Sequence, residues 1–498
     1  MLKRVFFLSF LVPLHFSFAQ KSITAAVETL KKDKDLRHAT WSLCVMNTKK
    51  DSAIAEYNSN VSVVPASTMK IVTTAAALSI LGSDFRFETQ LQYAGTFDST
   101  SGIIRGDVFI LGGGDPSLES EYFRDKKDST TAVEKWAKML YDKGVRTIEG
   151  NVIGDAGIFE DQMTPAQWIW ADMGNYFGAG ACGLTYHDNK FKLKFRSGAP
   201  GTSTSIHLIE PNIDGLEMVN HVTAGGSDDN AFIFGSQYSF YRTASGTIPA
   251  NKTDYEVEGS IPDPALFCTQ EFMRALKKAG ITVSGTATTV RAMNEFNELN
   301  ESLKGKEKKP ALLKDRKTIG SYYSPTLDKI VYWTNLKSLN LYAEHLLKYI
   351  AYKKTGFGSE NAGTEIVTNF WKAKGVDVSG FFMNDGCGLS RANVITTLTE
   401  TQVLREMTKD KNYAAFYNSL PIAGRTGSLG SLCDGTCAEN NLRAKSGYIT
   451  RARGYAGYVK NRKGELLCFS VLANNYECSP AEMKLKLEKI LIAIAESE

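Results

Sequence analysis

The alternation of apolar and polar residues predicts four helices. Residues Ile71 to Leu81 are apolar nearly all round, which indicates a helix buried inside a domain. Leu336 to Tyr352 repeats apolar residues at helical spacing, and a further helix is expected near Pro264–Ala279. A capping box with proline at the first helical position, Ser479–Glu482, opens the fourth helix, which continues to the C-terminus.

Strand patterns gather just before that last helix. Ala444–Arg451, Arg453–Lys460 and Glu465–Asn474 are expected to form consecutive strands, so the C-terminal part is predicted to be an antiparallel meander followed by a helix. Residues 95–300 are rich in glycine, threonine and short β-like runs. The charged segment Asn294–Lys317 is interpreted as a domain junction. These patterns predict an α+β protein.

Composition narrows the class without deciding the function. The chain has 498 residues, of which 43% are apolar and 22% charged, which suits two or three globular domains. No interior apolar run approaches the roughly 20 residues that a spanning helix needs, so no stable membrane span is expected. The net charge is 58 − 54 = +4, so nucleic acid is not an expected partner.

The N-terminus predicts export. Residues 1–19 combine a short basic start, an apolar run and small residues before Gln20, which is typical of a cleaved signal peptide and favours a periplasmic location over a membrane anchor. All eight cysteines follow the expected cleavage site. Disulfides are therefore permitted, but their pairing cannot be read from the sequence. Zinc is disfavoured because no cysteine pair has CxxC spacing.

The first candidate for chemistry is Ser67 followed by Lys70, the one Ser-x-x-Lys in the chain. At the start of a helix these positions share a face, so the amine can reach the hydroxyl. A positive helix terminus favours an alkoxide and disfavours a protonated amine, which suits a serine nucleophile with a lysine base. The motif alone is weak, and a capped surface helix is the ordinary alternative.

Two further polar groups complete the candidate set. Ser338 and Asn340 stand at the head of the helix expected over 336–352. We compare three basic–hydroxyl–glycine triplets, which begin at Lys354, Arg425 and Lys445. The first ends a helix and the second lies in a loop, whereas Lys445-Ser446-Gly447 leads into a strand, so we select Lys445 as the candidate.

Taken in order, Ser-x-x-Lys, Ser-x-Asn and Lys-Ser-Gly resemble the active-site set of penicillin-binding proteins and serine β-lactamases. About 270 residues separate Ser67 from Ser338. That spacing resembles the class C low-molecular-mass penicillin-binding proteins, the D-Ala-D-Ala carboxypeptidase/endopeptidase family, which carry domains inserted there. Further stretches similar to that family include 110–116, 148–155, 340–344, 385–391 and 420–424. Two departures are Ser446 for the usual threonine and Cys387 for the usual serine.

The resemblance implies a fold and a set of roles. A penicillin-binding-protein/serine β-lactamase-like catalytic domain, with an antiparallel sheet flanked by helices, is expected over 20–95 and 310–498, with mostly β accessory domains inserted at 96–309. Ser67 is implied as nucleophile and Lys70 as base. Ser338, Asn340 and Lys445 are implied to be catalytic, and Ser446, Gly447 and Tyr448 to bind substrate.

The resemblance also implies a substrate and inhibitors. Peptidoglycan stem peptides are the expected partner, β-lactams are expected to acylate Ser67, and no metal or organic cofactor is implied. Two alternatives stay open: a serine β-lactamase, and a non-catalytic cell-wall-binding protein, which would be expected to lack Ser67, Lys70 or Lys445. Carboxypeptidase and endopeptidase preference cannot be separated from these residues.

Overall fold

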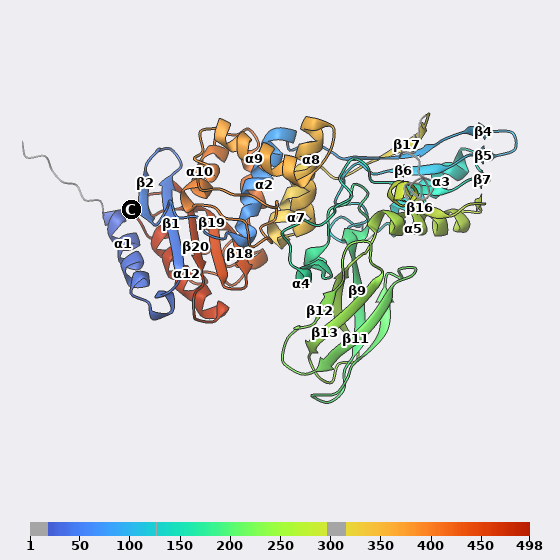
Figure 1. The fold of residues 1–498 in the computed structure, drawn as a ribbon. Coiled ribbons are helices and arrows are strands. Elements are labelled where there is room, and N and C mark those ends of the chain that lie inside the picture. The colour runs from blue at the N-terminus through green and yellow to red at the C-terminus, as the bar shows by residue number, and fades with distance from the viewer. Residues whose placement is uncertain (1–17, 126, 296–314) are drawn as a thin grey trace, which may run out of the picture.

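The computed structural model describes residues 18–125, 127–295 and 315–498 (Figure 1). Most of the expected signal peptide, and most of the charged segment 294–317, lie outside these ranges. Within them, no helix has both the length and the apolar character that crossing a bilayer requires. All eight cysteines are described and none forms a disulfide.

The half that the sequence predicts to be catalytic, called the catalytic half below, is built on a five-stranded sheet in the order β18-β19-β20-β1-β2, with every pair antiparallel. This confirms the predicted meander and adds two N-terminal strands to it. The strands are β1 (Thr40–Asn47), β2 (Ala53–Tyr57), β18 (Arg443–Ile449), β19 (Ala452–Lys460) and β20 (Leu466–Asn474).

Alternation along the central strands explains why helices cover both faces of this sheet. In β1, Leu43 and Val45 face a core shared with α1 (Phe18–Lys31) and α12 (Pro480–Ala495), whereas Cys44 and Met46 face the core of the other helices. A strand buried on both sides needs two apolar layers. The second layer consists of α2 (Met69–Leu81), α7 (Leu327–Lys337), α8 (Asn340–Thr355), α9 (Glu360–Ala373), α10 (Thr397–Met407) and α11 (Tyr413–Ser419).

The helix expected over 336–352 is interrupted, so that prediction was wrong. α7 ends at Lys337, Ser338 adopts a left-handed backbone (φ 59°, ψ 39°), and α8 begins at Asn340. The apolar spacing continues across the break because Leu341 and Leu346 pack into the same core as Ile330 and Val331. Periodicity therefore could not reveal the turn.

In its described residues, the inserted region has four sheets and the helices α3 (Ala132–Asp142) and α5 (Pro264–Lys278). One part is an α/β unit with two sheets, ordered β16-β8-β6-β3-β17 and β15-β7-β5-β4. Its strands are β3 (Glu88–Tyr93), β4 (Thr96–Asp98), β5 (Ile103–Arg105), β6 (Val108–Leu111), β7 (Thr147–Glu149), β8 (Val152–Asp155), β15 (Thr282–Val283), β16 (Ala287–Thr289) and β17 (Lys317–Tyr323).

The other part is a pair of three-stranded sheets that project below the α/β unit in Figure 1. Its strands are β9 (Lys190–Arg196), β10 (Ser205–Glu210), β11 (Glu217–Ala224), β12 (Phe232–Phe234), β13 (Tyr241–Ile248) and β14 (Tyr255–Ser260). The α/β unit extends beyond the expected limits of 96 and 309, because β3 pairs with β6 on one side and with β17 on the other.

Candidate active site

Ser67 lies on a single 3₁₀ turn, Ala66–Thr68, that leads directly into α2. Ala66 before it has a left-handed backbone, with φ 49°. Gly388 lies so close that a Cβ there would stand 1.8 Å from the carbonyl oxygen of Ala66. No side chain fits in that gap. Glycine is therefore required at position 388 for its loop to pack against the turn that carries Ser67.

Lys70 is fully buried beside Ser67. Its Nζ lies 3.0 Å from Ser67 Oγ, and it donates to Asn340 Oδ1 (2.6 Å) and to the carbonyl oxygen of Cys387 (2.8 Å). Desolvation lowers the pKa of Lys70, although Cys387, Asp385 and Glu344 oppose that shift. A neutral amine has two hydrogens for the two carbonyl oxygens and one lone pair for the hydroxyl proton, so these contacts suit a general base.

Ser338 and Asn340 reach the same place through the break between α7 and α8. Asn340 bridges two parts of the molecule, because its Oδ1 accepts from Lys70 and its Nδ2 donates to the carbonyl oxygen of Phe177 (2.8 Å) in the inserted region. The left-handed turn at Ser338 lets Ser338 and Asn340 line one cleft together with Ser67.

Strand β18 passes the nucleophile from the other side. A Cβ at Gly447 would stand 3.2 Å from the backbone nitrogen of Ser67, so the strand approaches the turn without a side chain between them. Lys445 is fully buried, donates to the Ser446 carbonyl oxygen (2.8 Å), and has a pKa well below its usual value because of burial and the nearby Lys70. Ser446 and Ser428 lie 2.6 Å apart through their hydroxyls.

The choice among the three triplets agrees with this placement. Lys354 is exposed near the end of α8. The triplet from Arg425 lies in the loop just before Ser428, and thus beside Ser446. Tyr448, whose exposure is 51%, lines the cleft.

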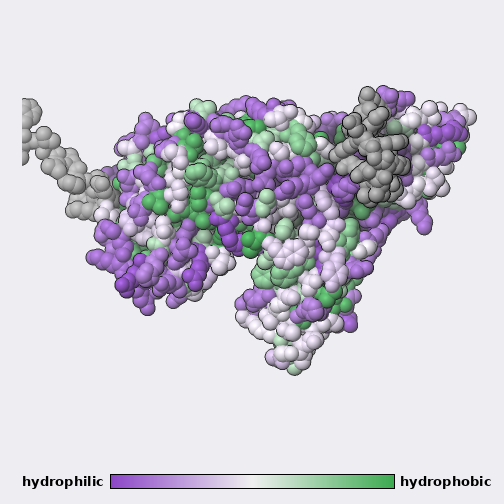
Figure 2. Space-filling view, viewed as in Figure 1, coloured by the Kyte–Doolittle hydropathy of each residue, from purple (hydrophilic) through white to green (hydrophobic). Residues whose placement is uncertain are grey.

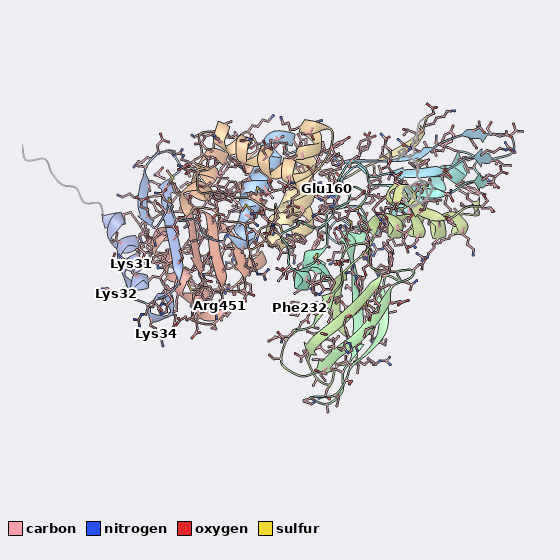
Figure 3. The ribbon with its side chains drawn as sticks, viewed as in Figure 1. Lys31, Lys32, Lys34, Glu160, Phe232 and Arg451 are labelled. Carbon is pink, nitrogen blue, oxygen red and sulfur yellow. The ribbon has the colours of Figure 1, made fainter. Side chains whose placement is uncertain are left out.

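The cleft has a volume of about 1040 Å³ and two walls of different origin. Ser67, Ser338 and Tyr448 come from the catalytic half, whereas Tyr176 and Phe232 come from the inserted region. A notch between the two halves is visible in the space-filling view (Figure 2), and Phe232 and Arg451 lie on opposite sides of it (Figure 3). Charged residues also line the cleft, including Glu121, Asp172, Lys190, Glu256, Glu258, Lys337 and Arg391.

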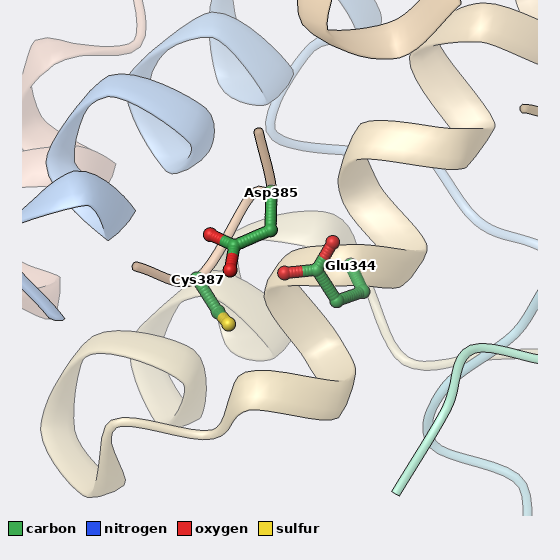
Figure 4. Close-up of side chains that lie close together, drawn as sticks. All are labelled: Glu344, Asp385 and Cys387. Atoms are coloured by element: carbon green, nitrogen blue, oxygen red, sulfur yellow. The ribbon is translucent and has the colours of Figure 1, made fainter. Parts of the chain in front are cut away.

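Behind Lys70 lies a buried cluster of Glu344, Asp385 and Cys387 (Figure 4), whose ligand-type atoms fall within 4.8 Å of one another. Asp385 is fully committed, because it accepts bonds from the Gly388 and Ser390 backbones, Asn393 Nδ2 and Trp168 Nε1. Glu344 in turn accepts a hydrogen bond from the backbone nitrogen of Gly386 (3.1 Å). This donor set therefore fits a hydrogen-bonded support for Lys70 better than a metal site.

Burial changes the charge of this cluster. It raises the pKa of Glu344 to about 8 and that of the Cys387 thiol well above its usual range. Both groups are therefore largely protonated near neutral pH. Protonation of Glu344 and Cys387 removes two of the three negative charges that would otherwise stabilise the ammonium form of Lys70, and so favours the neutral amine.

The structure brings all eight predicted residues to the cleft or its floor, and it adds contacts that the sequence did not assign. The Cys387 carbonyl, the Phe177 carbonyl and the Trp168 indole all support the site. For Cys387 a signal existed, since residues 385–391 carry part of the family resemblance. No sequence signal pointed to Phe177 or Trp168, because both belong to the inserted region and lie outside the stretches that resemble the family.

A serine and a buried lysine at the head of a helix, beside an antiparallel sheet, define the penicillin-binding-protein class of fold. The solved structure of penicillin binding protein 4 from Haemophilus influenzae has a TM-score of 0.76 at 20% identity, covering 94% of this chain and 97% of that one. A complex of that protein with a β-lactam has a TM-score of 0.71 at 19% identity, with the same coverage.

The sequence identifies the family. The chain matches the D-Ala-D-Ala carboxypeptidase 3 (S13) family over residues 23–492 and belongs to it. Among its relatives is the D-alanyl-D-alanine carboxypeptidase of Actinomadura sp. (strain R39), which is 26% identical over 484 residues, 94% of this chain and 84% of that protein. The expected family and fold class are thus confirmed, and the chain is a serine peptidase by family.

Proposed function

We propose that the protein is an exported serine DD-peptidase that cleaves D-Ala-D-Ala in peptidoglycan stem peptides through an acyl-enzyme on Ser67. The observation that carries this proposal is the contact of the fully buried Lys70 amine with the Ser67 hydroxyl at 3.0 Å. D-Ala–meso-diaminopimelate cross-links present the same D-Ala carbonyl, so the same chemistry extends to them.

The reaction begins with proton transfer. Ser67 Oγ forms a bond to the carbonyl carbon of the penultimate D-Ala while its proton passes to Lys70 Nζ. As the C–N bond breaks, Ser338 gives its proton to the leaving amine and receives the proton held by Lys70 Nζ, which leaves Lys70 neutral again. Water then attacks the ester and returns the proton to Ser67, releasing the shortened peptide.

The oxyanion is stabilised by the backbone N–H groups of Ser67 and Tyr448. Supporting this assignment, β18 packs against the Ser67 turn at Gly447 with no side chain between them. Loss of one such donor typically costs about 10²–10³ in rate.

The substrate's terminal carboxylate is recognised by Lys445 and Ser446. Burial lowers the pKa of Lys445, and a bound carboxylate gives its ammonium group a negatively charged partner. The Ser446 hydroxyl, adjacent to that of Ser428, donates to the carboxylate. Asn340 holds the substrate's amide and the Lys70 amine in register.

The chain's location and domain plan belong to the same proposal. Residues 1–19 direct export to the periplasm, 20–95 and 310–498 supply the catalytic domain, and 96–309 form the inserted part that supplies one wall of the cleft. β-Lactams acylate Ser67 because their strained amide resembles acyl-D-Ala-D-Ala.

Intact-mass spectrometry with benzylpenicillin tests the proposal, with Ser67→Ala as the control variant and D-Ala release from a D-Ala-D-Ala peptide as the second readout. The expected result is a persistent adduct on the Ser67 peptide, absent from the control, together with release of D-Ala. Rapid consumption of penicillin with no lasting adduct would instead favour a β-lactamase. Absence of adduct, penicillin turnover and D-Ala release would leave a wall-binding protein.

A further inference from the structure

A second groove lies beside the catalytic cleft, at the junction of α7, α11 and the inserted region. It has a volume of about 360 Å³, which falls within the range of small-ligand sites. Its walls combine aromatic with polar side chains: Phe123, Tyr332, Trp333, Asp328, Lys329 and Asn418.

The groove lies next to the cleft. The Trp333 ring lies 5.1 Å from the ring of Tyr122, which lines the cleft, and Phe123 follows Tyr122 in the chain. On α7, Lys329 and Trp333 line the groove, and Lys337, one turn further on, lines the cleft. The two cavities are therefore neighbours along α7.

The side chains suit a sugar. Tyr332 is 39% exposed and meets Trp333 edge to face at 5.4 Å, so the two rings offer an angled aromatic surface. Aromatic faces carry negative potential, which attracts the slightly positive C–H face of a pyranose. Lys329 and Asn418 have no side-chain hydrogen-bond partners among the described residues, and they are available to sugar hydroxyl and amide groups.

We propose that this groove binds the glycan strand to which the stem peptide is attached. The inference rests on the proposed function, because it takes peptidoglycan as the substrate. From Ser338 back to Lys329, α7 rises about 14 Å. Four extended residues span up to about 14 Å, so a stem peptide in the cleft reaches the groove with its sugar end.

The test compares one pentapeptide in two forms, free and attached to its disaccharide. Wild-type protein is expected to have the higher kcat/KM on the sugar-bearing form. Tyr332→Ala is expected to lower that value about threefold to tenfold and to leave the free peptide unchanged, whereas Tyr332→Phe keeps the preference. The matched control is Tyr323→Ala, which removes an exposed tyrosine from β17.

Each result separates the two proposals. If Tyr332→Ala leaves the sugar-bearing substrate unchanged, or lowers both substrates equally, the groove does not bind glycan. If the wild type cleaves neither substrate, the proposed function fails. Titration of wild-type and Tyr332→Ala protein with peptide-free glycan chains then tests glycan binding independently of cleavage. Weaker binding by the variant supports the proposed glycan site, and equal binding overturns it.

Discussion

Removing the lysine from water is what makes it useful as a base. An exposed lysine is charged at neutral pH and has no lone pair for a serine proton. Full burial lowers the pKa of Lys70, and the two carbonyl-type oxygens that it meets orient the amine without supplying a full negative charge. Glu344 and Cys387 nearby are largely protonated, so they add little negative charge that would raise the pKa of Lys70.

Replacing Lys70 with methionine is expected to slow acylation of Ser67 by about 10²–10⁴, because the general base is lost while the side-chain volume is nearly kept. The second-order rate of labelling by a fluorescent penicillin measures this. Lys348→Met is the matched control, since Lys348 is also fully buried but donates to the Gln162 carbonyl. A Lys70→Met rate within fivefold of wild type would refute the role of base.

Replacing Glu344 with glutamine is expected to move the acid limb of the kcat/KM profile to lower pH. Glu344, with its pKa of about 8, is partly ionised at pH 7–8, and its charge raises the pKa of Lys70. Glutamine carries no charge, so Lys70 stays neutral to lower pH. Glu360→Gln, which alters another carboxyl with a raised pKa, serves as control, and an acid limb that stays in place or rises would contradict the argument.

At the scale of elements, the break between α7 and α8 is the feature that periodicity could not predict. The apolar positions before and after Ser338 enter one core, so the pattern reads as a single helix. The three C-terminal strands were predicted to within about one or two residues, because each is bounded by a turn and because β19 and β20 are buried along nearly their whole length. A single residue with a left-handed backbone, such as Ser338, does not change the hydrophobic pattern, so the pattern cannot predict it.

Two substitutions of Ser338 are expected to separate stability from activity. Alanine and glycine both remove the hydroxyl, so both lower D-Ala release by about 10²–10⁴. The left-handed backbone costs alanine about 1 kcal/mol more than glycine, so Ser338→Gly is expected to be the more stable variant in urea unfolding. Equal stability of the two variants would show that the turn carries no strain.

At the scale of the molecule, one face of α8 joins the two halves. The Tyr342 hydroxyl lies 2.6 Å from Ser120 Oγ and 3.0 Å from Asp188 Oδ1, to which it can donate. His345 contacts Thr185 and the Gly114 carbonyl, and Lys348 donates to the Gln162 carbonyl. All three side chains are buried, so separating the halves would leave several polar groups without partners.

Acid is expected to weaken this junction through His345. Burial lowers its pKa to about 3, against about 6.5 for an ordinary histidine, so the unfolded chain binds its proton first. Stability is therefore lost as the pH falls from about 6.5 towards 3. His345→Asn is expected to remove about 2 kcal/mol of the stability change between pH 6.5 and 4.5, measured by urea unfolding.

The control for that prediction is His221→Asn on β11, where the histidine is exposed. It is expected to leave the pH dependence of stability unchanged. A His345→Asn variant whose stability falls with acid as steeply as wild type would show that another group governs the transition.

The sequence predicted the catalytic half better than the cleft. Each of the three motifs consists of residues close together in the chain, so it can be recognised from the sequence. Ser446 and Gly447, for example, directly follow Lys445. The second wall depends on contacts between residues far apart in the chain, such as Trp168 with Asp385 and Asn340 with Phe177. No local pattern pairs such residues, and the same reason hid the β3–β17 pairing across the insertion.

Strand β1, which is made early, pairs with β20, the last strand to be made, and β20 and β19 separate it from β18, which carries Lys445. The ribosome must therefore finish nearly the whole polypeptide before the sheet can close, and such distant pairing is slow to form. A nascent or truncated chain would hold Ser67 and Lys70 without β18 beside them. The order of synthesis thus delays hydrolytic competence until the chain is complete.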